Sequence, residues 1–354
     1  MRILNLFTRL FVGVIPWLVI ACLLYVGLFV KPEPIGSTVK PTAIESRDRF
    51  YSLVAIDTVL WAVGADGKIV RSEDAGTSWR VQPVPVTTHF QDIAAWDNNT
   101  AVVVGNEGIA LHTSDGGKTW QQSKAPVNDV VNKLLDVKAY ANGKAWAVGA
   151  FGTILFSRDY GKNWSYARET EDFIINEIAK RDDGGLVAVG EFGSILISES
   201  NGADWKSITA PVESSLMAID FQNASTGIAA GLEGILLKTV DGGFNWTRVG
   251  NSLVFEKVEA EPGIAFAGDW RDVTTEHIFS VVWHEGLNRW FGVGTKGLWL
   301  EADPSAVAWQ SGRLAPKDLA WHTSIAKTKY GVVLGGKNLG RWSKDHQWQV
   351  FQEL

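Results

Sequence analysis

The stretch AVGADGKIVRSEDAGTSW, residues 62–79, decides the fold because the chain repeats it. In the first six copies the glycine of the V-G pair precedes the final tryptophan by 15 residues, and in the last we align Gly335, 13 residues before Trp348. A period of about 41 residues built from short strands is typical of a propeller or a repeat array. The further copies occupy residues 103–120, 147–164, 188–205 and 229–246, followed by two less regular copies at 292–309 and 333–348.

Residues 89–124 illustrate the structure expected for one copy. Short apolar runs alternate with turn clusters at 97–99, 106–108 and 114–117, which predicts four short antiparallel strands and no helix. A closed ring of such sheets buries faces that a single sheet would expose. We therefore predict an all-β fold, a seven-bladed β-propeller of four-stranded antiparallel blades over residues 50–354. The blades are expected at about 50–82, 89–124, 133–168, 173–209, 214–249, 277–311 and 318–354, with an insertion at about 250–276.

The motif S/T-x-D-x-G-x-x-W, an Asp box, closes each regular copy. We expect its carboxylate to accept backbone N–H groups across the turn between the third and fourth strands. The glycine would supply a positive φ, and the tryptophan would fold back over the hairpin. Ser200 replaces the aspartate in the fourth copy, and the sixth and seventh copies lose the motif. The structural residues expected are Asp74, Trp79, Asp115, Trp120, Asp159, Trp164, Trp205, Asp241 and Trp246.

The first 31 residues differ from the rest. Residues 10–30 carry no charged side chain and as a helix would span roughly 30 Å, the thickness of a bilayer core. Because Arg2 and Arg9 precede them, we predict a single-pass anchor of the cytoplasmic (inner) membrane over residues 1–31, with the N-terminus in the cytoplasm. A Pro-containing linker at 32–49 would then lead to a periplasmic propeller. Two alternatives stay open: a cleaved signal peptide, and a lipid on Cys22, since residues 19–22 resemble a lipobox.

Composition and motifs argue against several functions. The formal net charge is −6, from 33 basic and 39 acidic residues, which is not the footprint of a nucleic-acid-binding protein. The chain contains no H-E-x-x-H, Walker loop, G-x-S-x-G or cysteine cluster, and its six histidines are scattered. We therefore predict no catalytic residues, no cofactor and no metal site.

The repeats predict one face that differs from blade to blade. Thirteen residues before each aligned glycine lies a position that should begin the innermost strand, on the face where the G-x-x-G turns also open. Acidic residues dominate this face in the first five blades, two phenylalanines lie on adjacent blades, and lysines follow in the last two. Such a face is suited to docking a partner, although its residues are equally expected as solvated turn residues. The candidate partner-binding residues are Asp92, Asp136, Glu177, His322, Phe151, Phe192, Lys296 and Lys337, with Trp270 and Arg271 from the insertion.

Asp boxes occur in sialidases, in sortilin-type receptors and in the photosystem II assembly-factor family of plastids and cyanobacteria. The combination of A-V-G-x-x-G-x-I-L with D-x-G-x-x-W over residues 50–354 most resembles the last family. The resemblance implies a non-enzymatic seven-bladed propeller that holds an immature membrane-protein subunit during assembly. In non-photosynthetic bacteria it implies an accessory role beside a large membrane transporter, such as one of the resistance-nodulation-division type.

Together these features predict a membrane-tethered scaffold or assembly factor. Its partner would be a polytopic inner-membrane protein or complex, either a transporter or an assembling subunit. The alternative is an Asp-box carbohydrate-active enzyme of the sialidase type, or a glycan-binding module using the tryptophans between residues 283 and 342. The F/Y-R-I/L-P segment that supplies a catalytic arginine in sialidases is absent. A sensor domain of a larger complex is a third possibility.

Overall fold

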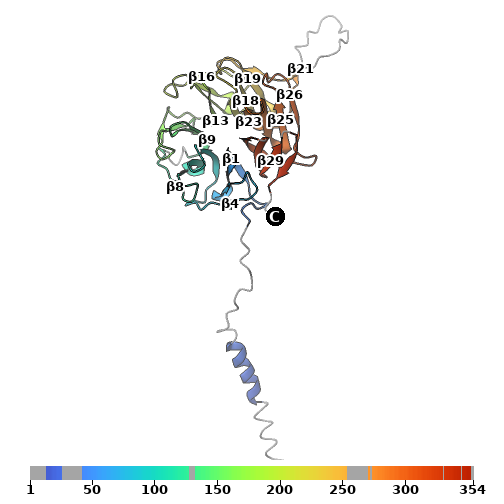
Figure 1. Ribbon diagram of the computed structural model, residues 1–354. Helices are drawn as coiled ribbons and strands as arrows, with labels where there is room; N and C mark the ends of the chain where they lie inside the picture. The colour runs from blue at the N-terminus through green and yellow to red at the C-terminus, as the bar shows by residue number, and fades with distance from the viewer. Residues whose placement is uncertain are drawn as a thin grey trace, which may run out of the picture. The chain divides into compact units, whose positions relative to one another are not determined.

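The computed structural model describes residues 13–25, 42–126, 132–252, 270–271, 273–329, 331–343 and 345–351. The chain divides into two compact units, Met1–Thr42 and Ala43–Leu354. In the first unit, residues 13–25 form an exposed helix (Figure 1). None of the helices in the described part of the chain is both long and apolar enough to cross a membrane. The predicted span at residues 10–30 extends beyond the described residues at both ends, so the anchor stays a prediction.

The second unit is a ring of sheets, as Figure 1 shows. Its described residues form seven four-stranded antiparallel sheets, each built from consecutive strands, and one two-stranded sheet. We number the blades one to seven in chain order. Blade one contains β1 (Phe50–Ile56), β2 (Val59–Gly64), β3 (Ile69–Ser72) and β4 (Arg80–Val81). Blade two contains β5 (Phe90–Ala95), β6 (Ala101–Gly105), β7 (Ala110–Thr113) and β8 (Gln121–Gln122). Blade three contains β9 (Leu134–Tyr140), β10 (Lys144–Gly149), β11 (Ile154–Ser157) and β12 (Ser165–Tyr166).

The remaining blades repeat this order. Blade four contains β13 (Ile175–Lys180), β14 (Leu186–Gly190), β15 (Ile195–Ser198) and β16 (Lys206–Ile208). Blade five contains β17 (Leu216–Phe221), β18 (Gly227–Gly231), β19 (Leu236–Thr239) and β20 (Thr247–Arg248), and the small sheet pairs β21 (Asn251–Ser252) with β22 (Trp270–Arg271). Blade six contains β23 (Ile278–His284), β24 (Arg289–Gly294), β25 (Leu298–Ala302) and β26 (Trp309–Arg313). Blade seven contains β27 (His322–Thr328), β28 (Gly331–Gly336), β29 (Gly340–Ser343) and β30 (Trp348–Val350).

Strand pairing defines two faces of the ring. Phe50, at the start of β1, pairs with Gly64, at the end of β2, so the first strand begins where the second ends. The G-x-x-G turn follows Gly64, which places it on that same side, the top face. The Asp-box turn lies at the other end, on the bottom face. The top-face turns form short 3-10 segments, η1 to η5, in blades one, two, four, five and six: Ala65–Gly67, Asn106–Gly108, Glu191–Gly193, Leu232–Gly234 and Thr295–Gly297.

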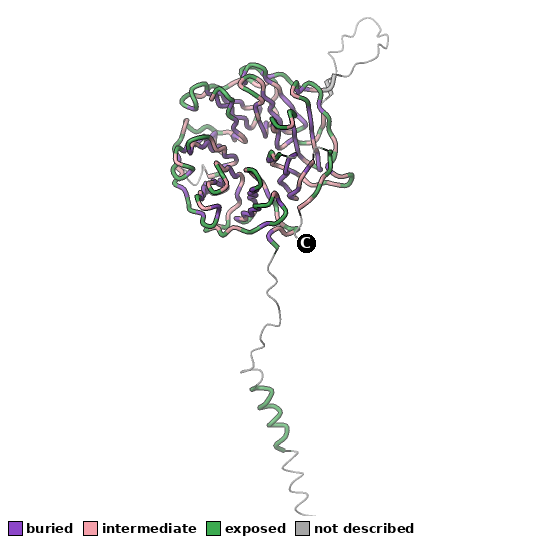
Figure 2. Tube along the Cα trace, viewed as in Figure 1, coloured by how far each residue is buried: buried purple, intermediate pink, exposed green. Residues whose placement is uncertain are grey.

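The hydrophobic core is divided among the contacts between blades. Every residue of β2 is buried, because this strand has a neighbouring sheet on each side. Buried apolar side chains form seven clusters, and each cluster joins two adjacent blades. Figure 2 shows this burial running through the ring. A blade therefore gains its stability from its neighbours, as expected of a repeat fold.

Blades one and seven close the ring without exchanging a strand. Leu53 and Trp79 of blade one share a cluster with Ala326 and Val333 of blade seven. The ring of Phe351 lies 5.7 Å from that of Trp79. The same cluster contains buried Ala43, which the sequence analysis assigned to the linker. The last residues of the predicted linker therefore pack on the propeller, because their apolar side chains cover blade one.

The register of the seventh copy differs from our alignment. His322 pairs with Gly336, as Phe50 pairs with Gly64, so Gly336 and not Gly335 is the equivalent glycine. The alignment was wrong by one residue because two glycines are adjacent and the following turn has a different length. Lys337 therefore occupies the first variable position of its turn, whereas Lys296 occupies the second position in blade six.

Candidate functional site

The Asp boxes form the turns between the third and fourth strands. Asp74 accepts the backbone N–H of Ser78 at 2.8 Å and its hydroxyl at 2.7 Å, while the Trp79 indole donates to the Gly76 carbonyl at 3.1 Å. These bonds lower the pKa of Asp74 to about 2, with the backbone and hydroxyl groups of Ser78 as the main causes. Asp115, Asp159 and Asp241 accept the same pair of bonds from Thr119, Asn163 and Asn245.

The fourth copy keeps the turn with a changed set of partners. Ser200 stands in the aspartate position and exchanges hydrogen bonds with Asp204, whose backbone N–H donates to the serine at 3.1 Å. The indole of Trp205 packs edge-on against Trp146, with ring centroids 6.3 Å apart. Trp120 packs against Trp61 in the same way, at 5.8 Å. All the Asp-box residues named from the sequence thus serve the turn and its contact with the preceding blade.

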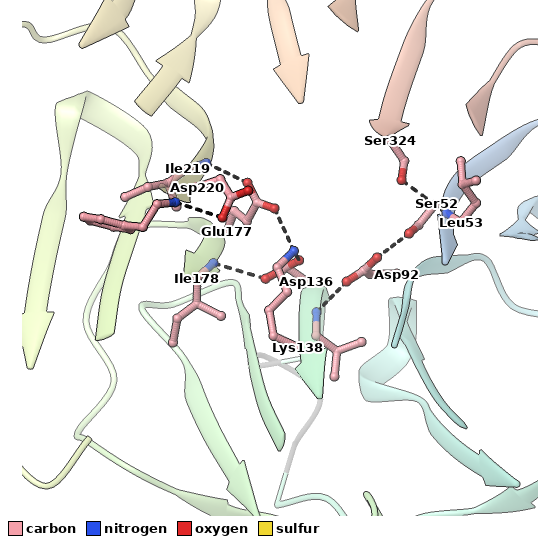
Figure 3. Close-up of polar contacts among 12 residues, drawn as sticks. Ser52, Leu53, Asp92, Asp136, Lys138, Glu177, Ile178, Ile219, Asp220 and Ser324 are labelled. Atoms are coloured by element: carbon pink, nitrogen blue, oxygen red, sulfur yellow. Dashed lines mark hydrogen bonds and ion pairs between the residues drawn. The ribbon is translucent and has the colours of Figure 1, made fainter. Parts of the chain in front are cut away.

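Three of the predicted top-face residues lie instead in the central channel. Asp92 accepts the backbone N–H of Val137 at 2.7 Å, and Asp136 accepts that of Ile178 at 3.1 Å. Glu177 accepts the N–H of Ile219 at 2.7 Å. In each case a carboxylate on one blade's innermost strand binds the backbone of the next blade (Figure 3). These carboxylates satisfy donors on an edge strand that has no further strand to pair with.

Other side chains make equivalent ties elsewhere in the ring. The Ser324 hydroxyl accepts the N–H of Leu53 at 3.2 Å and so joins blade seven to blade one. Asp220 accepts the N–H of Trp283 at 2.9 Å, between blades five and six. Strand register shows that the residues structurally equivalent to Asp92, Asp136 and Glu177 are Ser52, Ala218, Ser280 and Ser324.

Lys138 is the channel residue that the sequence analysis missed. Its ammonium lies 2.6 Å from Asp136 and 2.7 Å from Glu177, and so bridges blades three and four (Figure 3). Burial works against this charge, but Asp136, Glu177 and Asp92 outweigh it and raise the pKa of Lys138 well above its usual range. A signal was present in the sequence, because Lys138 follows Asp136 by two residues and therefore shares its face of the strand.

Burial raises the pKa of the channel carboxyl groups, whereas it acts to lower the pKa of Lys138. Burial raises the pKa of Glu177 to about 7, although Lys138 opposes the shift. Burial and then repulsion by Asp136 raise the pKa of Asp92 well above its usual range. Desolvation disfavours the charged form of an acid, and a second carboxylate nearby adds to this effect.

A cavity of about 650 Å³ occupies the channel and is lined by all seven innermost strands. Tyr51, Met217 and Phe279 also line the cavity. Each lies one residue nearer the start of its strand than the position equivalent to Asp92. The polar groups below them are held by backbone N–H groups and Lys138. Within the described residues, no group of three or more His, Cys, Asp or Glu side chains is arranged to hold a metal ion.

His322 is not a surface residue. Its side chain is fully buried, and neither ring nitrogen has a hydrogen-bond partner among the described residues. Burial lowers the pKa of His322 to about 4. The prediction that it faces a partner is therefore wrong. The one-residue error in the seventh copy caused it, because His322 occupies the core position held by Phe50 in blade one.

The tips of the top-face turns are exposed in several blades. Phe192 is 74% exposed and has a φ of 55°, in the left-handed region. Phe151 occupies the equivalent position of blade three, with the same φ, and is half-buried. Lys296 is exposed and pairs with Glu276 at 3.1 Å, while Lys337 is half-buried. Trp270 and Arg271 form β22, and their side chains lie outside the described residues.

The tryptophans considered as sugar platforms are mostly core residues. Trp283, Trp290 and Trp342 are buried between blades. Trp299 stacks on His346 at 5.1 Å, and Trp321 stacks on Tyr51 at 5.9 Å. A side chain of the propeller itself thus stacks on Trp299 and on Trp321, where a sugar ring would have to stack.

Comparisons with known proteins agree with this geometry. The sequence model of a family described as Photosynthesis system II assembly factor YCF48 matches residues 74–171. Among curated proteins, no sequence is similar enough to this chain to count as a match.

Solved structures share the fold at low sequence identity. A structure of YCF48 bound to a D1 peptide has a TM-score of 0.64 and 19% identity, over 84% of this chain and 91% of that one. YCF48 from Cyanidioschyzon merolae has a TM-score of 0.64 and 17% identity, over 83% of this chain and 94% of that one. PorZ, a surface component of the type-IX secretion system of Porphyromonas gingivalis, has a TM-score of 0.60 and 11% identity, over 86% of this chain and 38% of that one. The chain is therefore a seven-bladed β-propeller that shares its fold with YCF48, and its residues 74–171 match the sequence model of that family.

Proposed function

We propose that this protein is a non-catalytic scaffold that binds a segment of a polytopic membrane protein on the top face of its propeller. The observation that carries the proposal is the pair of phenylalanines at equivalent turn tips of adjacent blades, with Phe192 74% exposed. The same position holds a charged residue in blades one, two, five and six: Asp66, Glu107, Glu233 and Lys296. An exposed aromatic side chain surrounded by polar tips is the usual anchor of a protein interface.

The YCF48-like fold supports this assignment, because one such propeller has been solved with a membrane-protein peptide bound. We propose that the partner here is a polytopic inner-membrane protein, either an assembling subunit or a transporter of the resistance-nodulation-division type. The channel carboxylates are bonded to backbone groups and Lys138, which supports a scaffold rather than a hydrolase.

A photo-crosslinking experiment tests the binding face. A crosslinking amino acid at position 192 should capture a polytopic membrane protein from native membranes, identified by mass spectrometry. Phe192→Ser should reduce partner recovery at least tenfold and leave the thermal midpoint unchanged. Phe244→Ser, which changes a 42% exposed phenylalanine on the bottom face, is the matched control and should retain recovery. Equal recovery with both variants would contradict the proposed face.

We further propose that residues 1–31 anchor the protein in the cytoplasmic membrane, with the propeller on its outer side. The uncharged residues 10–30 and the two arginines that precede them support this proposal. The full chain should stay in the membrane pellet after alkaline extraction. Mass spectrometry of the purified full-length protein separates the two kinds of anchor, because a lipid-anchored chain would begin at a lipid-modified Cys22 and a helix-anchored chain keeps the residues before it. We expect these residues to be retained and Cys22 to be unmodified.

A further inference from the structure

The central channel holds more negative charge than its structural role requires. Asp92, Asp136 and Glu177 lie on three consecutive innermost strands, and each accepts one backbone N–H from the next blade. In blade seven the neutral hydroxyl of Ser324 makes the same kind of bond to Leu53. A neutral hydroxyl is therefore enough to accept the backbone hydrogen bond between two blades. The negative charge of the three carboxylates needs another explanation.

One ammonium group, that of Lys138, forms ion pairs with these carboxylates. Lys138 is bonded to Asp136 and Glu177, and its side chain is 34% exposed toward the channel. Asp92 accepts hydrogen bonds from the Ser52 hydroxyl and the Val137 N–H, both neutral donors. Asp92 accepts the N–H of the residue that follows Asp136, at 2.7 Å, which brings the two carboxyl groups to the same contact between blades, and repulsion by Asp136 helps to raise the pKa of Asp92. Two neighbouring carboxylates in this position are stable when they share a proton.

The other titratable groups around the channel do not replace that proton. Tyr140 faces the same space, and burial raises its pKa far above neutrality, so it stays uncharged. The Lys180 ammonium lies over the Tyr140 ring at 5.1 Å, and Lys327 pairs with Glu285 at 3.1 Å. Asp220 has a raised pKa, mainly through burial, so it adds a further acid that binds its proton tightly.

We propose that a proton held between Asp92 and Asp136 acts as a latch that stabilises the contact between blades two and three, which we call the seam. Loss of this proton would weaken that contact. With the proton present, Asp92 ties blade one through Ser52 and blade three through Val137 without repelling Asp136. Without it, the half-buried Asp92 carboxylate and the buried Asp136 carboxylate repel each other across the seam that these bonds close. This inference concerns the propeller itself and does not depend on the proposed partner.

The direction of the pH effect follows from the raised pKa values. A carboxyl group whose pKa is higher in the folded than in the unfolded state stabilises the fold below its unfolded value, and this stability is lost as the pH rises through the folded value. For Glu177 the window runs from about 4.5 to about 7. For Asp92 the raised pKa acts in the same direction, so the contact between blades two and three weakens as the pH rises.

The variant Asp92→Asn tests the latch because asparagine resembles protonated aspartic acid. Its amide oxygen keeps the acceptor for Val137, its amide nitrogen replaces the oxygen that accepts the Ser52 hydroxyl, and the side chain carries no charge beside Asp136 at any pH. The difference in thermal midpoint between the variant and wild type should grow by about 3 °C or more from pH 5 to pH 9. Using this difference removes the contribution of other titrating groups such as His322. Asp57→Asn, in the exposed turn between β1 and β2, is the matched control, and its difference should stay constant.

Two measurements complete the test. In the wild-type protein, carboxyl carbon NMR should show Asp92 keeping its proton to a higher pH than a free aspartate, which decides the matter even if the variant fails to fold. Protection factors of the Val137 amide, corrected for intrinsic exchange, should fall at least tenfold from pH 5 to pH 9, while those of Leu53, tied by the neutral Ser324, should not. The latch is refuted if Asp92 titrates below pH 5, or if Asp92→Asn tracks wild type at every pH.

Discussion

At the scale of single residues, the glycine of the Asp box meets two constraints at once. Gly202 has a φ of 84°, and a Cβ there would lie 1.9 Å from the Trp146 ring of the preceding blade. A Cβ on Gly161 would similarly lie 2.7 Å from Val102. The motif therefore sets a turn and also lets one blade approach the next. Asparagine could satisfy the first requirement but not the second.

Alanine substitutions at Gly202 and at Gly184 separate the effect of the positive φ from that of the contact between blades. Both glycines have positive φ, but a Cβ on Gly184 meets nothing within 4 Å. Gly184→Ala should lower the free energy of unfolding by about 1 kcal/mol, from backbone strain alone. Gly202→Ala should lower it by about 2–5 kcal/mol, because the clash with Trp146 is added. Urea denaturation measures both, and similar losses would show that the blade contact contributes nothing.

The fourth Asp box can be restored by exchanging its two polar residues. Ser200→Asp together with Asp204→Asn recreates the pairing of Asp159 with Asn163 and should add about 1 kcal/mol of stability at pH 7. The new carboxylate should resemble Asp74, whose pKa falls from 3.8 to about 2, so the gain is lost as the pH falls through that range. Ser200→Asp alone should stabilise less, because Asp204 then repels it. A single variant as stable as the double would contradict this account.

At the scale of the strand, β27 differs from its six counterparts in its first residue. The equivalent residues of the other blades are buried and apolar: Phe50, Phe90, Leu134, Ile175, Leu216 and Ile278. His322 takes this place, packs edge-on against Trp348 at 5.2 Å, and finds no hydrogen-bond partner for either ring nitrogen in the part of the chain that the structure describes. An unpaired polar group in a core position costs about 1–3 kcal/mol. Blade seven is therefore less stable than its pattern of strands alone indicates.

His322→Phe should raise the stability of the propeller, and more so in acid. The pKa of His322 falls from 6.5 to about 4 on folding, so the unfolded chain binds the proton first and stability declines between pH 6.5 and pH 4. We expect a gain of about 1–2 kcal/mol at pH 7 and a larger gain at pH 5 in thermal denaturation. Ile175→His, the reciprocal change in blade four, should create the same acid sensitivity. A gain that is equal at the two pH values would show that His322 is not held neutral.

At the scale of the whole molecule, stability depends on closing the ring by side-chain contacts. Among the described residues each blade is built from consecutive strands, and none of these strands joins the sheet at the other end of the chain. Blade seven meets blade one through Ser324 and Leu53, through a bond from Arg341 to the Ala75 carbonyl, and through Phe351. This last side chain fills the space beside Gly76, where a Cβ would lie 2.6 Å from its ring.

Phe351→Ala should weaken this closure. We expect a loss of about 1–3 kcal/mol, with hydrogen exchange rising in both β1 and β27, because either blade loses its neighbour. Val350→Ala is the control, since Val350 pairs with Gly340 in its own blade. Faster exchange confined to β30 would show that Phe351 supports only the end of the chain.

Local pattern was enough to predict much of this protein. The repeated glycines and tryptophans predicted seven sheets and the Asp-box turns, because those features depend on residues within one hairpin. The one-residue error in the seventh copy arose at Gly335 and Gly336, where two candidate glycines are adjacent. Strand pairing resolves this ambiguity, and with it the burial of His322.

The sequence by itself therefore determined the repeating unit and its number, since hydrophobic alternation and turn residues act over short distances. Only the tertiary structure decided that Asp92, Asp136, Lys138 and Glu177 meet in one channel. These residues come from three blades, and the contacts between those blades depend on how many sheets close the ring and at what angle. That geometry is a property of all seven blades packed together, so no single repeat contains it.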